Sequence, residues 1–287
     1  MKLLIQPGDG VAPVVRAIHK AKKTIDIVIF RFDRAEVEKA LDGAVDRGVV
    51  VRALIAHTNK GGEKNLRKLE LRLLACGATV ARTADDLARY HGKMMIVDGA
   101  ALHVYGFNYT KLDIEHSRSF GVVTRDKKIV REAQQLFDAD ALRQSYTPTH
   151  PRLVVSPENS RAVLTAFIKG ARKELLIYDA CVSDNAIQKV LAERANAGVK
   201  IRILGGMEKP NPDIKVRRLA MMRLHVRAII RDGRTAFIGS QSLRKLELEG
   251  RREVGIIVQN GGIVRKIAAV FESDWEKNRK KADAQAS

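Results

Sequence analysis

The sequence of 287 residues contains one short motif twice, and this repetition constrains the fold more than any other feature. The first copy runs from His91 to Gly99 and the second from His225 to Gly233, an offset of 134 residues (225 minus 91). Both copies read His, any residue, a cation, four residues, Asp and Gly. Chance would have to place the same residue types in the same register twice, so the motif indicates two equivalent halves.

Each copy predicts a local structure that brings two functional groups together. Residues two apart in an extended segment point to the same side, so the His and the cation lie next to each other. The apolar run before Asp predicts a buried strand, and Asp-Gly is typical of a hairpin turn. A single His on a strand is more often structural than catalytic, but two such copies can face one phosphate.

The segments around the motif repeat as well. A strand-helix-strand-helix-strand pattern precedes each motif, and residues 49–54 match 199–204 at an offset of 150. The first half therefore carries 16 extra residues before its His (150 minus 134). This order predicts an α/β fold in which each half is a mixed, mostly parallel sheet covered by helices. Prolines and polar residues at 143–151 predict an extended connector, which divides the chain into residues 1–147 and 148–287.

The charge of the chain favours anionic partners. Lys and Arg number 52 against 33 Asp and Glu, which gives a net charge of +19. This excess suits nucleic acid, an anionic bilayer surface or phosphate-bearing substrates, although a generally basic surface is the simpler interpretation. A basic stretch before Cys76 could follow a phosphate backbone, or it could be a solvated face; its cations are Lys60, Lys64, Arg67, Lys68 and Arg72.

Other features of the sequence narrow the class of protein. No apolar stretch approaches the roughly 20 residues of a membrane span, and the first residues form too short an apolar run for a signal peptide. We expect a cytoplasmic protein without a transmembrane segment, with peripheral contact to an anionic membrane as an option. No Cys or His pair has zinc-type spacing, so we expect neither a metal nor another cofactor.

The motifs resemble those of the phospholipase D superfamily, whose mark is a duplicated His-x-Lys-x4-Asp motif followed by a Gly-Ser-like turn and an Asn. In this chain Tyr105-Gly106-Phe107-Asn108 follows the first motif, and Gly239-Ser240-Gln241-Ser242 follows the second. The family also tends to carry a downstream acidic residue, and Glu253 fits this position. The resemblance covers essentially the whole chain. It implies two tandem repeats packed with pseudo-two-fold symmetry around one shared active site, which needs no oligomer.

Four positions depart from the family pattern. Arg227 stands in place of Lys, Ser242 in place of Asn, Tyr105 in place of Gly and Ser119 in place of the acidic residue. Arginine keeps the positive charge but is a planar fork and not a compact point donor. The second half-site is therefore weakened or adapted to another substrate, or the chain is a non-catalytic phosphate-binding or DNA-binding module.

The resemblance implies an enzyme, a metal-independent phosphodiesterase or phosphatidyltransferase with a phosphohistidine intermediate. One neutral His attacks phosphorus, and the other, protonated, donates to the leaving oxygen. We assign His91 as nucleophile and His225 as general acid, because His91 stands in the intact motif, and we expect Glu253 to orient a His. The residues expected to bind phosphate are Lys93, Arg227, Asn108 and Ser240 or Ser242. Asp98 and Asp232 are expected to support the hairpins and to back the residues that contact phosphate, without carrying protons.

Three functions remain open for this site. The resemblance slightly favours hydrolysis or transfer of phospholipid head groups, as in phospholipase D or cardiolipin synthase. The charge favours a nuclease or another nucleic-acid phosphodiesterase. The departures at Arg227 and Ser119 leave the non-catalytic binding module as a third. In each case the partner is an anionic phosphodiester, and the loops at 58–63 and 208–213 are expected to shape its pocket.

Overall fold

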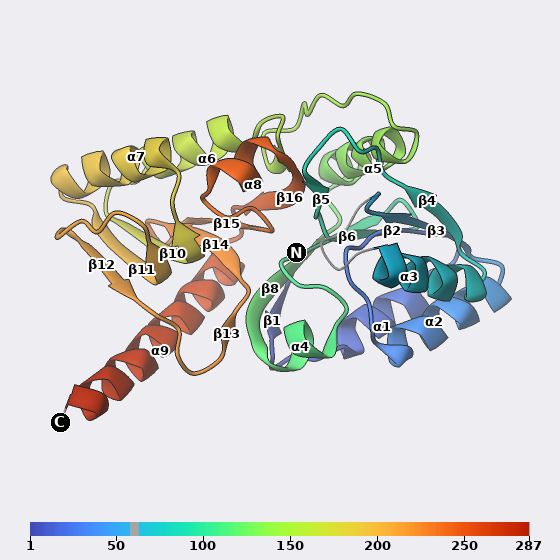
Figure 1. Cartoon of the computed structure of the whole chain (residues 1–287), viewed down its shortest axis with the longest axis horizontal. Helices are drawn as coiled ribbons and strands as arrows, with labels where there is room; N and C mark the ends of the chain where they lie inside the picture. Colours follow the sequence, from blue (N-terminus) through green and yellow to red (C-terminus); the bar gives the residue numbers. More distant parts are fainter. Residues whose placement is uncertain (58–62, 287) are drawn as a thin grey trace.

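The computed structural model describes the backbone of residues 1–57 and 63–286, and two eight-stranded sheets form its centre (Figure 1). The first sheet contains β1 (Lys2–Gln6), β2 (Thr24–Val28), β3 (Val50–Ile55), β4 (Thr79–Arg82), β6 (Met94–Val97), β7 (Ala101–Tyr105), β8 (Ser117–Thr124) and the short β13 (Arg223–Leu224). The second sheet contains β9 (Leu153–Ser156), β10 (Glu174–Val182), β11 (Lys200–Met207), β12 (Ile214–Arg217), β14 (Arg227–Arg231), β15 (Thr235–Gly239), β16 (Arg251–Val258) and the short β5 (Arg89–Tyr90).

Helices cover both sheets in the same order. The first half contains α1 (Ala12–His19), α2 (Ala35–Asp46), α3 (Glu63–Ala75), α4 (Lys111–Glu115) and α5 (Lys127–Ala141). The second half contains α6 (Ser160–Lys169), α7 (Asn185–Asn196), α8 (Lys245–Glu249) and α9 (Gly261–Ala286). The predicted α/β fold with two repeats is confirmed. The boundary between residues 147 and 148 stays a prediction.

Each sheet is mixed, but the prediction of mostly parallel sheets is wrong, because four strand pairs are antiparallel and three are parallel among the described residues of each sheet. The strands β2, β3 and β4 pair in parallel, and the helices α2 and α3 connect them. The strands β10, β11 and β12 also pair in parallel; α7 connects the first two, and residues 208–213 connect the last two. The motif strands β6 and β14 pair antiparallel with β7 and β15 through three-residue connections, 98–100 and 232–234. Asp98, Gly99, Asp232 and Gly233 all have φ between 54° and 62°, the left-handed conformation that this mirror-image turn requires.

Two short strands are exchanged between the halves. β5, from the first half, pairs in parallel with β16 of the second sheet, and β13, from the second half, pairs with β8 of the first sheet. His91 directly follows β5 and His225 directly follows β13. The exchange therefore carries each motif His to the sheet of the other half; Figure 1 shows β5 and β13 between the two halves.

The two halves share one core. Phe120 on β8 and Tyr178 on β10 meet edge to face, with their ring centroids 5.6 Å apart. Beside them Arg118 forms a buried ion pair of 2.7 Å with Asp274 on α9, and the Tyr178 hydroxyl donates to the same carboxylate. Because buried apolar and charged contacts both cross between the halves, the groups at their junction are held in a fixed arrangement.

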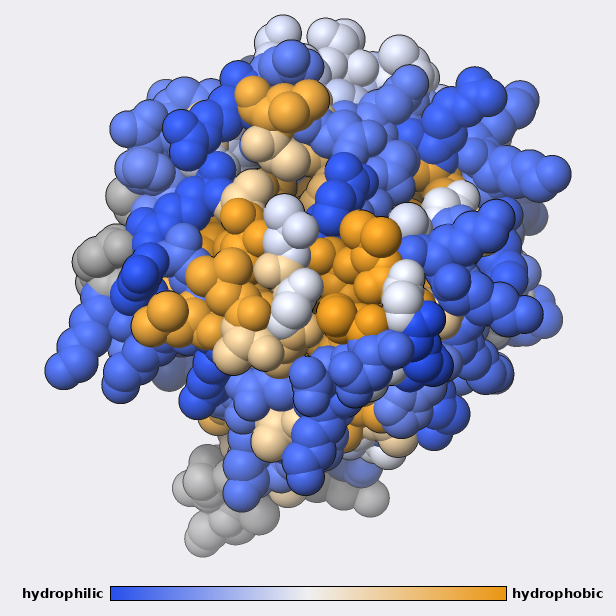
Figure 2. All heavy atoms as spheres, turned by 90° about the vertical axis from the view of Figure 1, so that its right-hand side faces the viewer, coloured by the Kyte–Doolittle hydropathy of each residue, from blue (hydrophilic) through white to orange (hydrophobic). Residues whose placement is uncertain are grey.

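One end of the first sheet exposes apolar side chains. Figure 2 shows an apolar area surrounded by hydrophilic residues on the face where α2, α3 and the start of β3 lie. Val50, Leu71 and Leu74 are about half exposed there, at 56%, 50% and 48%. This is the end of the strands opposite to the motif histidines. None of the described helices is long and apolar enough to cross a membrane.

Candidate active site

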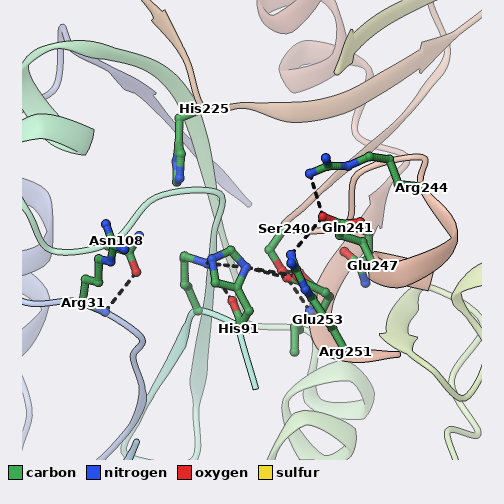
Figure 3. Close-up of polar contacts among 12 residues, drawn as sticks. Arg31, His91, Asn108, His225, Ser240, Gln241, Arg244, Glu247, Arg251 and Glu253 are labelled. Carbon is green, nitrogen blue, oxygen red and sulfur yellow. Dashed lines mark hydrogen bonds and ion pairs between the residues drawn. The ribbon is translucent and has the colours of Figure 1, made fainter. Parts of the chain in front are cut away.

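His91 is held by a carboxylate from the other half of the chain. Its Nδ1 lies 3.0 Å from both carboxylate oxygens of Glu253, which is on β16 (Figure 3). Glu253 is fully buried, and the His91 side chain is 19% exposed. The backbone N–H of His91 also donates to the carbonyl of Arg252, as a consequence of the exchanged strand. The carboxylate at Nδ1 fixes the proton on that nitrogen and leaves the Nε2 lone pair for chemistry.

Lys93 completes this half-site. Its Nζ lies 3.1 Å from Nε2 and 3.2 Å from Nδ1 of His91, and it donates to the His91 carbonyl at 2.6 Å. The side chain is fully buried. The prediction that the imidazole and the cation lie side by side is therefore confirmed for the first motif.

The second half-site is built differently. His225 also receives a carboxylate from the other half, but this is Asp113 on α4, with Oδ2 3.6 Å from Nδ1. Asp113 already accepts from the backbone and side-chain N–H groups of Asn108 and pairs with Arg223 at 2.5 Å. In the part of the chain that the structure describes, His225 Nδ1 is buried without a hydrogen bond.

The departures from the family pattern explain this difference. Ser119 on β8 occupies the position equivalent to Glu253, and its buried hydroxyl has no hydrogen-bond partner among the described residues. Arg227 donates from Nη1 to the carbonyl of Val226 at 2.8 Å, and its Nε is likewise buried without a described partner. Unlike Lys93, Arg227 makes no hydrogen bond to its motif His among the described residues. The second His thus has its carboxylate farther away, at 3.6 Å, and has no cation bonded to its ring among the described residues.

Burial sets the protonation states of the site. Burial lowers the pKa of His91 to about 4, although the negative charge of Glu253 acts to raise it. Burial likewise lowers the pKa of His225, although the negative charge of Asp113 acts to raise it. Burial also lowers the pKa of Lys93 to about 8. For Glu253, burial alone would raise the pKa, but His91 and Lys93 outweigh it and hold the pKa below its usual range. At neutral pH both imidazoles are therefore neutral, while Lys93 and Glu253 are charged.

Two of the residues predicted to bind phosphate, Asn108 and Ser240, lie at the site. Asn108 lines the active-site cavity, where its Oδ1 accepts from the Arg31 backbone at 3.1 Å and its Nδ2 donates one of its two hydrogens to Asp113. Ser240 bonds the backbone of Val254 beside Glu253. Both residues hold other parts of the site in place.

Ser242, which is also expected to bind phosphate, does not line the active-site cavity. Its hydroxyl donates to Asp179 at 2.5 Å, and the second oxygen of this carboxylate accepts from the Leu243 backbone. The buried Asp179 therefore keeps Ser242 in the turn that follows β15, where its hydroxyl is already engaged.

Asp98 and Asp232 support the hairpins, as predicted from their place in the turn. Asp98 accepts from the backbone N–H groups of residues 22–24, and Asp232 accepts from those of residues 172–174. Each lies at the far end of its motif strand, seven residues from the His and, at a rise of ~3.3 Å per residue, roughly 20 Å away. They hold strands together, but neither contacts a residue that lines the active-site cavity among the described contacts, contrary to the expectation that they also back the site.

A cavity of about 290 Å³ opens onto both histidines. Figure 3 shows His225 pointing toward the space between His91 and Asn108. The lining residues are Phe30, Arg31, Asp33, Arg89, His91, Asn108, Thr110, Leu112, Asp113, Arg223 and His225. Three arginines thus face the two imidazoles, and Phe30 packs against His91 with centroids 4.8 Å apart.

A second cavity of about 420 Å³ adjoins the first, since both are lined by Phe30, Arg31, Asp33 and Thr110. The basic helix predicted from the sequence contributes Lys68 and Arg72 to its wall. Lys64 and Arg67 do not line it.

The sequence predicts that the loops at 58–63 and 208–213 shape the active-site pocket. Residues 208–213 do not line the active-site cavity, and Lys60 and residues 58–62 lie outside the described residues. The cavity is instead shaped by α4 and by the segments around Arg31 and Arg89.

Sequence reasoning missed Asp113 and the two arginines that precede the histidines. Arg89 and Arg223 stand two residues before the two histidines, at the same offset of 134 (223 minus 89). Asp113 and Glu247 share this offset as well (247 minus 113). Extending the comparison of the two halves beyond the motif would have found all of them. No group of three metal-ligating side chains occurs among the described residues.

Comparisons with known proteins agree with this architecture. The family described as "Cardiolipin synthase, PLD-like domain" matches residues 14–141 and 164–275, one stretch in each half. A polyphosphate kinase from Porphyromonas gingivalis is similar in structure, with a TM-score of 0.78 and 20% identity over 96% of this chain and 50% of that one. Phosphatidylserine synthase from Haemophilus influenzae Rd KW20 has a TM-score of 0.72 and 10% identity over 96% of this chain and 86% of that one.

These structural likenesses show the fold alone. The chain spans about half the length of the polyphosphate kinase, and no curated protein sequence matches it at a significant level. The family match covers most of both halves and agrees with the duplicated motif. The chain belongs to the phospholipase D superfamily, in the family of cardiolipin synthase PLD-like domains.

Proposed function

We propose that this protein is a metal-independent phosphodiesterase or phosphoryl transferase that works through a phosphohistidine on His91. The observation that carries the proposal is the pairing across the halves, which places Glu253 at Nδ1 of His91 and opens both histidines onto one cavity. A neutral imidazole with its proton fixed on Nδ1 presents Nε2 as a nucleophile.

The reaction proceeds in two displacements. Nε2 of His91 attacks phosphorus and forms the P–N bond while the bond to the leaving oxygen breaks, and protonated His225 donates its proton to that oxygen. His225, now neutral, takes a proton from water or an alcohol, whose oxygen attacks phosphorus and releases His91. Lys93 and the cavity arginines Arg89 and Arg223 balance the charge on the phosphoryl oxygens, where one such donor is worth about 3 kcal/mol.

Asp113 supplies the charge that Ser119 lacks. At 3.6 Å it favours the protonated form of His225, and the bound phosphate adds a second negative charge nearby. His91 is held by Glu253 and Lys93, so it suits the role of the nucleophile, whose position must be exact to a fraction of an ångström. The loosely held His225 suits the acid, which must gain and lose a proton in each turnover.

Two substrate classes remain candidates. Phospholipid head groups rest on the description of the family and on the anionic membranes that a basic protein can approach. Nucleic-acid phosphodiesters are favoured by the adjoining cavity, because Arg31, Lys68 and Arg72 provide positive charge beyond the scissile phosphate. A non-catalytic binding module is the third possibility, since the second half-site lacks both the family Lys and the family acid.

Hydrolysis of bis-p-nitrophenyl phosphate in EDTA tests the reaction class, with wild type beside His91→Ala and His225→Ala. We expect EDTA-resistant turnover in wild type and none in His91→Ala. Because p-nitrophenolate leaves without a proton, His225→Ala should release about one equivalent in a burst and then stall. Mass spectrometry of the stalled protein should place the covalent phosphoryl adduct on His91.

The same variants separate the alternatives. A burst in His91→Ala with the adduct on His225 would reverse the two roles. Folded wild-type protein without turnover on this ester, on phosphatidylglycerol vesicles or on an oligonucleotide would support the binding module. Turnover of only one of the two natural substrate types would settle the substrate class.

A further inference from the structure

Three cavities adjoin one another along the side of the first half. The first cavity, of about 500 Å³, lies between α1 and the turn after β6. The second, of about 600 Å³, lies between this turn and α5. The third, of about 720 Å³, lies between α5 and the connector at residues 149–151. The first and second share Ala100 and Arg125, and the second and third share Lys127 and Arg131. They therefore form one continuous path.

Eight exposed cations line this path, which we call the basic groove. They are Lys2, Arg16, Lys20, Lys22, Arg125, Lys127, Lys128 and Arg131. None of the eight forms an ion pair with any side chain that the structure describes, whereas arginines elsewhere, such as Arg52 and Arg152, pair with carboxylates. The groove therefore presents eight positive charges that no described carboxylate pairs with.

The two carboxylates in the groove are bound by neutral donors. Asp98 accepts from three backbone N–H groups, and Glu132 accepts from the Tyr146 hydroxyl at 2.8 Å and from the hydroxyl and backbone of Thr149. Neither carboxylate forms an ion pair with a groove cation among the described residues. The groove keeps an excess of positive charge that only an external anion can balance.

We propose that the basic groove binds the phosphate backbone of double-stranded nucleic acid. A series of exposed cations along a concave path suits a polymer with regularly spaced phosphates, because each contact releases counterions. A flat bilayer cannot enter such a path. No Phe, Tyr or Trp occurs among the lining residues, so the groove offers no platform for the bases of a single strand. Binding is therefore to the backbone and independent of sequence.

This site is separate from the proposed chemistry. Asp98 lines the groove at the far end of the motif strand, roughly 20 Å from His91 at a rise of ~3.3 Å per residue. The groove would hold nucleic acid whether the active site acts on that polymer or on another phosphodiester. The inference can be tested without any turnover.

The test is fluorescence anisotropy of a labelled 20-base-pair duplex with the full chain, from 50 to 300 mM NaCl. The groove variant is Lys20→Glu with Lys127→Glu, which reverses one charge in the first cavity and one shared by the other two. The matched control is Lys189→Glu with Lys266→Glu, which changes the net charge equally at two exposed lysines of the second half. Circular dichroism checks that both variants fold.

We expect the groove variant to raise the Kd about 10-fold or more at 100 mM NaCl and to reduce the slope of log Kd against log salt by about 2. The control should change Kd less than about 3-fold, and both variants should hydrolyse bis-p-nitrophenyl phosphate as wild type does. Equal weakening in the two variants would show that net charge alone acts. Failure of wild type to bind the duplex, tighter binding of a single strand, or groove-dependent binding of phosphatidylglycerol vesicles alone would overturn the proposal.

Discussion

His91 and Glu253 stand 162 residues apart in the chain, yet the Nδ1 of His91 lies 3.0 Å from both carboxylate oxygens of Glu253. The contact exists because β5, just before His91, pairs with β16, which carries Glu253. The orienting acid of one half thus serves the histidine of the other. Neither half contains a complete site, and the chemistry depends on the junction between them.

Replacing Glu253 by Gln tests this relationship. The amide keeps the shape but removes the charge that fixes the proton on Nδ1, so we expect kcat to fall roughly 10- to 100-fold. Loss of the negative charge should also lower the pKa of His91 further, which moves the acid limb of the pH profile to lower pH. Glu249→Gln, at a partly exposed position on α8, is the control and should leave both quantities unchanged.

The pH dependence of kcat/KM follows from the lowered pKa values of the two histidines. The reaction needs His91 neutral and His225 protonated, and burial disfavours the second state. For a phosphodiester with an alkyl leaving group, we expect the measured kcat/KM to rise as pH falls from 8 toward 5, because more His225 is protonated, and to fall again near pH 4, where His91 gains its proton. Above pH 8 the loss of charge on Lys93 lowers activity further. An optimum above pH 8 would contradict these assignments.

Much of this arrangement follows from local pattern. The apolar residues before Asp98 predict a buried strand, and Asp-Gly predicts the hairpin, since both depend on neighbours in the chain. The His and the cation two residues apart predict the contact of Lys93 with His91. Duplication then predicts two such units and one shared site.

The partners of the histidines could not be predicted in the same way. Which acid faces which His depends on the exchange of β5 and β13, and these two-residue strands are fixed by packing between the halves. The hydroxyl of Ser242, a predicted phosphate ligand, donates to Asp179, 63 residues earlier, and the motif gives no sign of this contact. The constant offset of 134 residues identifies equivalent positions in the two halves. It does not show which residues their side chains contact.

Asp113→Asn tests whether this residue replaces the acid that is absent at Ser119. The amide can still accept from Asn108, but it no longer favours protonated His225, so kcat should fall about 10-fold or more while KM changes little. The loss should be larger for an alkyl leaving group than for p-nitrophenolate, which needs no proton. A purely structural role would affect both substrates equally. Adding Ser119→Glu to the variant should restore part of the difference.

Asp98→Ala tests the hairpin anchor by its effect on stability. Three backbone N–H groups lose their acceptor, so the free energy of unfolding should fall by about 1–3 kcal/mol, measured from guanidinium denaturation. The backbone N–H groups of residues 22–24 hold the pKa of Asp98 below its usual range, outweighing the effect of burial. Its contribution is therefore present above the unfolded pKa of about 4 and is lost as pH falls through the folded value. Asp98→Asn should retain part of the stability without this pH dependence, and its turnover should equal that of wild type.

Arg227→Lys tests whether the second half-site can be rebuilt toward the first. Arg227 donates to the Val226 carbonyl and leaves its Nε buried without a described partner, whereas Lys93 contacts both ring nitrogens of His91. A lysine ammonium at 227 can reach the phosphate as a compact donor, so kcat should rise by about 3- to 10-fold. The mirror-image variant, Lys93→Arg, should reduce kcat by roughly 100-fold because a planar fork does not fit the fully buried position beside His91. If Arg227→Lys instead lowers kcat as strongly as Lys93→Arg does, the guanidinium is itself a substrate-binding group, and the second half-site is adapted to a substrate that needs its fork.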